Sequence, residues 1–257
     1  MPVSLEPILP HIPAFLLVLF RLTGLFIFAP LLGSSVIPVR IKALLTLVLA
    51  FCVYPVIPPQ LPIELSLMSM AGAVATELTI GLVIGWGASL PMMAMQMGGL
   101  VMGQQLGLGV AELFNPDIGD QVSPISQLYF LMAVAIFLLL DGHHFMIGVL
   151  VNSFSNVPLG AWRPSESMLM TATGMMSSMF DLGFRVAAPL LGLVFLETVA
   201  IGFIARTVPQ LNILSLGFPM RILMGLTIFI ATLTAINTEL IEYIEQVMLR
   251  LHDLIIS

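Results

Sequence analysis

The residues best suited to chemistry lie in one run, Asp141-Gly142-His143-His144. A carboxylate beside two imidazoles supplies metal ligands and groups that exchange protons near neutral pH. However, adjacent histidines on a helix point to different sides, and the remaining histidines, His11 and His252, lie near the termini without metal-type spacing. We therefore expect a turn at a helix end in this run, and no bound metal.

No other pattern indicates catalysis. The chain has neither the G-x-S-x-G of a serine hydrolase nor the G-x-x-x-x-G-K that cradles phosphate, and Gly107-Leu108-Gly109 lacks the third glycine of a dinucleotide fingerprint. The net charge is −6, with 14 acidic and 8 basic residues and no basic cluster. We expect no catalytic residue, no cofactor and no nucleic acid partner.

The segment from Gly98 to Asp120 is too polar for hydrocarbon yet lies between long apolar runs. Gly99, Gly103 and Gly107 recur every four residues, a spacing that lets two helix backbones approach closely. Turn-forming residues follow and predict a loop that carries acidic groups: Glu112, Asn115, Pro116, Asp117, Gly119 and Asp120. At membrane depth such a loop must be buried by protein or face water.

Methionines precede this segment: Met92, Met93, Met95, Met97 and Met102. Their thioether side chains are unbranched and adaptable, so they often fill gaps in a core. Beside a polar loop they could instead form a deformable seal that yields to a passing chain. The sequence leaves both interpretations open.

The elements that position these residues are apolar helices. Of 257 residues, 59% are hydrophobic and 9% charged, and the mean hydropathy is +1.10, which indicates a membrane-embedded, all-α chain. Apolar runs predict six or so helices near residues 12–32, 41–57, 67–95, 122–140, 167–180, 186–205 and 213–236. The first run contains Arg21 and no cleavage site, so we expect no removable signal peptide.

Prolines are expected to break the second half into short pieces: Pro158, Pro164, Pro189, Pro209 and Pro219. Residues 237–257 read as an amphipathic C-terminal helix, which either caps its own bundle or docks on a partner helix. Apart from these features the chain, 1–257, is expected to form a single unit.

Six charged residues lie within or at the edges of the apolar runs: Arg21, Glu77, Asp141, Arg185, Glu197 and Arg221. A charge facing lipid costs at least about 2.5 kcal/mol at mid-membrane. Some could pair inside the chain, or Arg185 and Arg221 could reach the membrane interface. We expect partner helices of a larger oligomer to cover these residues.

Several motifs, in order, resemble the FliR family of type III secretion export-gate proteins from about residue 15 to 225: Arg21-Leu22-Thr23-Gly24, Ala29-Pro30, Ile37 to Lys42, Gly103-Gln104-Gln105-Leu106-Gly107, Asn115-Pro116, Gly142-His143-His144, Ser153-Phe154, Pro158, Arg206, Pro209-Gln210-Leu211-Asn212 and Gly217-Phe218-Pro219. The order and spacing of these motifs carry the resemblance.

The resemblance implies a membrane-associated bundle of long kinked helical hairpins, in which a FliP-like part precedes a FliQ-like hairpin, built into a helical hetero-oligomer. It implies a non-enzymatic subunit in the bacterial inner membrane at the flagellar basal body. Its partners would be FliP and FliQ homologues, with FlhB and FlhA homologues adjoining, and unfolded flagellar proteins would pass through the centre.

A loop over about 107–120 would plug the pore, with these residues at the plug or gate: Gly107, Gly109, Glu112, Leu113, Phe114, Asn115, Pro116 and Asp117. Close packing at Gly99 and Gly103 would hold its stem. A small-solute transporter that uses Glu77, Asp141 and a helix broken near Pro189 is the alternative. A lipid-active enzyme that depends on His143 or His144 is a third hypothesis.

Overall fold

The computed structural model describes residues 11–34, 36–57, 67–107, 123–163, 165–207 and 213–256. Within these ranges the regular structure is entirely helical, which confirms the all-α prediction. The helices are α1 (His11–Phe28), α2 (Val39–Val53) with the 3-10 turn η1 (Tyr54–Val56), α3 (Leu67–Gln105), α5 (Pro124–Leu139), α6 (Gly142–Asn156), α7 (Glu166–Thr207) and α8 (Ile213–Ile256).

Five segments of the described chain are long and apolar enough to cross a membrane: α1, α2 with η1, most of α3, the whole of α7 and most of α8. The bent pair α5 and α6 could supply one more span. These lengths and compositions confirm a helical membrane bundle. With 42 residues, α7 measures roughly 63 Å, about twice the hydrocarbon thickness of a bilayer.

The prediction that prolines would divide the second half is wrong for two of them. Pro189 lies inside α7 and Pro219 inside α8, so the runs 167–180 and 186–205 are one helix. In membrane helices, neighbouring helices and local adjustments can satisfy the backbone carbonyl that proline leaves without a donor. Residue type alone therefore did not locate the helix ends.

The C-terminal segment is not a separate helix, because residues 237–256 continue α8 without a break. Leu240, Ile244, Val247 and Leu251 on this segment are buried within the chain. Their burial favours the first alternative, in which the segment caps its own bundle.

The contacts within the chain divide it into two compact units. Unit 1 comprises residues 1–90, 137–175 and 245–257, and unit 2 comprises 91–136 and 176–244. Helices α3, α5, α7 and α8 contribute residues to both.

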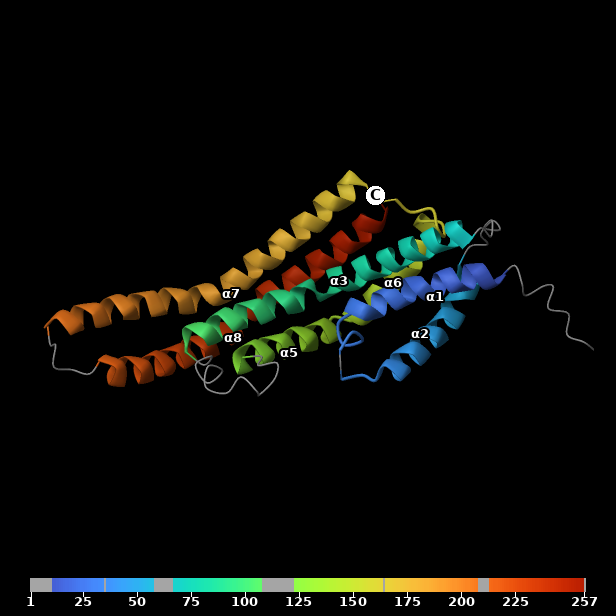
Figure 1. Ribbon diagram of the computed structural model, residues 1–257. Coiled ribbons are helices and arrows are strands. Elements are labelled where there is room, and N and C mark those ends of the chain that lie inside the picture. The colour runs from blue at the N-terminus through green and yellow to red at the C-terminus, as the bar shows by residue number, and fades with distance from the viewer. Residues whose placement is uncertain are drawn as a thin grey trace, which may run out of the picture. The chain divides into compact units, whose positions relative to one another are not determined.

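In unit 1, α1 and α2 lie side by side (Figure 1). Helix α3 lies against α1 at glycines on both helices. A Cβ on Gly85 would be 2.6 Å from the Leu25 carbonyl oxygen, and Cβ atoms on Gly24 and Gly81 would overlap backbone atoms of the facing helix. The two backbones are therefore in direct contact, which places Arg21 of α1 beside α3.

In unit 2, α3 packs against α7, the residue after α3 packs against α8, and α5 packs against α8. A Cβ on Gly98 would be 2.8 Å from the Gly183 carbonyl oxygen of α7, and a Cβ on Gly225 of α8 would overlap the Leu106 side chain. Tyr129 of α5 forms a 2.9 Å hydrogen bond with the Thr232 hydroxyl of α8 and an edge contact with Phe229. The C-terminal part of α3 thus lies inside this unit.

Candidate functional site

Most of the predicted plug lies outside the described residues: Gly109, Glu112, Leu113, Phe114, Asn115, Pro116 and Asp117. Gly107 is described and has a φ of +75°, a conformation that glycine adopts without strain. Its backbone lies under the Phe218 ring of α8, since a Cβ there would be 3.0 Å from Cε2. Gly107 therefore lies two residues beyond the end of α3, against Phe218 of α8.

The two predicted packing glycines face the beginning of α5. A Cβ on Gly99 would lie 2.6 Å from the Cα of Ser126, and a Cβ on Gly103 would overlap the Ser123 hydroxyl. The described residues that precede and follow the segment 108–122 therefore lie close together in unit 2. The Ser123 hydroxyl there is buried, and no described residue hydrogen-bonds to it.

The five methionines divide by helix face. Met92, Met95 and Met102 are buried within the chain, as expected of side chains that fill a core. Met93 is 44% exposed and Met97 is half-buried. A sealing role, which stays a prediction, rests in the described structure on Met93 and Met97.

A buried polar network fills the centre of unit 1. The Arg21 Nε lies 2.5 Å from Glu77 Oε2, and both side chains are 0% exposed. Nη1 of Arg21 donates to the Ser153 hydroxyl at 2.8 Å, and Nη2 to the Val157 carbonyl at 3.3 Å. The guanidinium carbon also lies 4.1 Å from the centroid of the Phe154 ring. The cation is therefore held by α1, α3, α6 and the segment after α6.

The Glu77 carboxylate is fully engaged in this network. Oε2 accepts from Arg21, while Oε1 accepts from the Gly160 backbone N–H at 2.8 Å. Gly160 has a φ of +72° and packs against Ala73, so the chain turns tightly over α3. Glu77 is thus a structural partner inside the chain and not an open ion-binding group, which removes the main residue of the transporter hypothesis.

Most of the charged residues in the apolar runs form ion pairs inside the chain, while their cover by partner helices stays a prediction. Arg221 Nε lies 2.9 Å from Glu197 Oε2, and Arg185 Nε lies 2.9 Å from Asp181 Oδ2. With Arg21 and Glu77, five of the six charged residues have partners in their own chain. The sequence concealed these pairs because two of the three join different helices.

Arg221→Met is expected to lower the free energy of unfolding by about 1 to 3 kcal/mol, because it leaves the Glu197 carboxylate buried without its cation. The Glu197 side chain is only 4% exposed, whereas that of Arg221 is 32% exposed, which moderates the cost. Thermal unfolding in detergent, followed by circular dichroism, measures the change. Arg185→Met is the matched control and should change stability by less than about 0.5 kcal/mol, because its pair is exposed. Equal losses of stability in Arg221→Met and Arg185→Met would show that the burial of Glu197 does not determine the cost.

The Asp141 run begins α6, and its two imidazoles do not diverge as predicted. The His143 and His144 rings lie 4.1 Å apart at an interplanar angle of 35°. His144 Nδ1 lies 3.3 Å from Asp141 Oδ1. The two histidines lie in the first turn of α6, directly after Asp141, whose backbone is left-handed. Side chains at such a helix start need not point in the directions that hold inside a helix.

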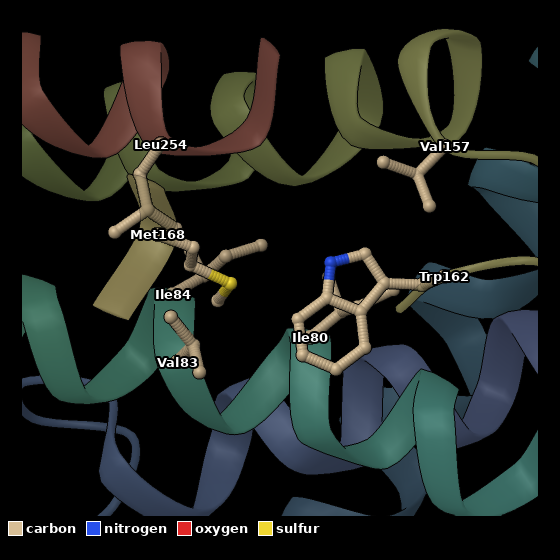
Figure 2. Close-up of a pocket in the computed structure, with 7 residues that line it drawn as sticks. All are labelled: Ile80, Val83, Ile84, Val157, Trp162, Met168 and Leu254. Carbon is tan, nitrogen blue, oxygen red and sulfur yellow. The ribbon is translucent and has the colours of Figure 1, made fainter. Parts of the chain in front are cut away.

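A small pocket lies in unit 1 beside the network. Figure 2 shows its lining, with the Trp162 indole between Ile80 and Val157. The lining residues carry no charge: Ile80, Val83, Ile84, Val157, Trp162, Met168 and Leu254. Such a lining offers a polar solute few partners, so this pocket does not support a transport site either.

Comparison with known proteins decides the family. The family model described as bacterial export proteins, family 1, matches residues 12–247. The chain belongs to this family. It is a component of bacterial protein export with membrane-type helices, which confirms the resemblance drawn from the motifs.

Relatives in this export family cover most of the chain. The flagellar biosynthetic protein FliR of Bacillus subtilis (strain 168) is 29% identical over 237 residues, which are 90% of this chain and 90% of the relative. The protein of the same name from Escherichia coli (strain K12) is 27% identical, over 85% and 83% of the two chains. The Yop proteins translocation protein T of Yersinia pestis is 28% identical over 80% of each.

Motifs that suggested the export family meet in the fold. Arg21 of the first motif contacts Ser153 and Phe154 of a later one, although 132 residues separate Arg21 from Ser153. Sequence reasoning did not find this contact. The only signal was the presence of both motifs in one chain, which carries no distance information.

Proposed function

We propose that this chain is a non-enzymatic subunit of the flagellar type III protein export gate, in the bacterial inner membrane at the basal body. The observation that carries the proposal is the family match over residues 12–247, together with relatives named for flagellar biosynthesis that align along most of their length. In this proposal the FliP-like part comes first and the α7–α8 hairpin corresponds to the FliQ-like part.

The apolar faces of the structure support assembly with other helical subunits. Because the membrane charges are largely paired internally, these faces provide the argument for partners. Helix α7 exposes large side chains: Phe184, Phe195, Leu196 and Phe203. We propose that FliP and FliQ homologues cover part of such surfaces, that FlhB and FlhA homologues adjoin, and that unfolded flagellar proteins are the cargo.

Purification from native membranes in mild detergent tests this assembly. A gate subunit should elute with several small helical membrane proteins, identified by mass spectrometry, in a particle much heavier than 28 kDa. Elution as a monomer or homo-oligomer that still transports a solute in vesicles would favour the transporter alternative. Loss of export but not of cell growth on deletion of the gene would separate a flagellar gate from a housekeeping role.

We further propose that residues 107–120 plug the channel at rest. The flanks support a fixed stem, because Gly99 and Gly103 pack on α5 and Gly107 lies under Phe218. Glu112 and Asp117 would present acidic groups to partner backbone or to cargo, and Met93 and Met97 would border the plug.

Deletion of residues 110–116 is expected to make cells leak small ions while the complex still assembles, because the channel would lose its closure. Membrane potential dyes and particle size after purification measure the two properties. An equal deletion of residues 58–64, between α2 and α3, is the control and should leave the membrane tight. An assembled deletion complex that stays tight would contradict the plug assignment.

A further inference from the structure

The first turn of α6 brings together three groups that ligate transition metals. One donor atom from each of Asp141, His143 and His144 lies within 4.8 Å of the other two. Two imidazole nitrogens and one carboxylate oxygen suit zinc and its neighbours in the first transition series. Nothing in the proposed export function uses these groups.

Asp141 occupies the N-cap position of α6 without performing the usual capping role. Its backbone is left-handed, with φ 54° and ψ 28°, and its side chain makes no capping hydrogen bond. An N-cap aspartate ordinarily accepts from a backbone N–H of the first turn. Here Oδ1 lies beside His144 Nδ1 instead, at 3.3 Å, which leaves the carboxylate available as a ligand.

The imidazoles supply an independent observation. The two ring centroids lie 4.1 Å apart at an interplanar angle of 35°, so the imidazoles of neighbouring residues lie side by side. His143 Nδ1 is buried, and no described residue hydrogen-bonds to it. A buried ring nitrogen without a partner is unfavourable, and a rotation of the imidazole that lets one of its nitrogens coordinate a cation would relieve this cost.

The backbone of Gly142, between Asp141 and His143, is packed tightly against neighbouring side chains. A Cβ on Gly142 would overlap the Phe137 ring and would lie 2.7 Å from Cε of Met248 on α8.

Ligand atoms on one tetrahedral zinc are about 3.3 Å apart, given bonds of about 2.0 Å. Asp141 and His144 can close the remaining distance by rotation, because their side chains are 74% and 73% exposed.

We propose that Asp141, His143 and His144 bind one divalent transition-metal ion of the zinc class, with water completing its coordination. The proposal does not rest on the proposed export function, so its failure would leave that function intact. Its chemistry is that of a surface site with one open position, set on the turn between α5 and α6.

The test uses the full chain in detergent after removal of any polyhistidine tag, with Zn²⁺ measured by calorimetry and Co²⁺ by visible absorption. One equivalent per chain is expected, with a Kd on the order of micromolar. His144→Gln should weaken binding at least about tenfold and abolish the intense Co²⁺ bands of low coordination number. Because His144 is exposed, this variant has no reason to unfold.

His252→Gln is the matched control, because His252 also lies near a carboxylate, with Nδ1 3.9 Å from Asp253 Oδ1, but has no third ligand in the described structure. It should bind Zn²⁺ like the unaltered chain, whereas Asp141→Asn should bind more weakly. Unchanged affinity in His144→Gln, loss in His252→Gln, or no binding of the unaltered chain at about 100 μM Zn²⁺ would each overturn the site.

Discussion

Replacing Glu77 by leucine is expected to lower the free energy of unfolding by about 3 to 5 kcal/mol, the usual cost of leaving one partner of a buried ion pair uncompensated. Arg21 would keep its bonds to Ser153 and Val157 but would lose the 2.5 Å contact that neutralises it. The Gly160 N–H would also lose the Glu77 Oε1 that accepts its hydrogen bond. Thermal or denaturant unfolding in detergent, together with the amount of folded chain in membranes, measures this loss.

The double variant Arg21→Met with Glu77→Leu separates charge from packing. It removes both ions and leaves neutral side chains of similar volume, so it should be more stable than Glu77→Leu alone. It should remain less stable than the unaltered chain, because the Gly160 N–H and the Val157 carbonyl still lack partners. Asp181→Asn, which removes the acid of an exposed pair, is the control and should change little. If the double variant is no more stable than Glu77→Leu, the unpaired buried charge is not the cause of the lost stability.

Gly81→Ala is expected to destabilise the chain by about 3 kcal/mol, at the upper end of the range for overpacked sites. The added Cβ would overlap the backbone carbonyl of Arg21, and a backbone cannot turn aside as a side chain can. Helix α1 would have to move away from α3, which would also stretch the contact between Arg21 and Glu77. Thermal unfolding in detergent measures the shift.

Gly72→Ala is the matched control on the same helix. Gly72 lies in α3 with nothing within 4 Å of an added Cβ. Alanine there should raise stability by up to about 1 kcal/mol, because it favours the helix over glycine without meeting a neighbour. The two substitutions therefore have opposite expected signs. Losses of similar size at both sites would show that close contact between α1 and α3 is not the cause.

Sequence alone identified the class of molecule. Its apolar runs predicted a helical membrane chain because about 20 apolar residues are needed to cross hydrocarbon, and composition records that requirement directly. Motif order from Arg21 to Pro219 identified the export family that the comparison confirmed. Spacing of Gly99 and Gly103 also placed glycines on a helix surface, where the structure shows them facing α5.

Tertiary structure decided which groups meet. It paired Arg21 with Glu77, at a separation of 56 residues, and both with α6 and Gly160. It continued α7 and α8 through Pro189 and Pro219 and brought the ring centroids of His143 and His144 to 4.1 Å from each other. Periodicity reports which face of a helix is apolar, but it does not report which helix will lie against that face. The sequence therefore shows that a charged residue in an apolar run needs a partner, but only the packing of the helices determines which residue that partner is.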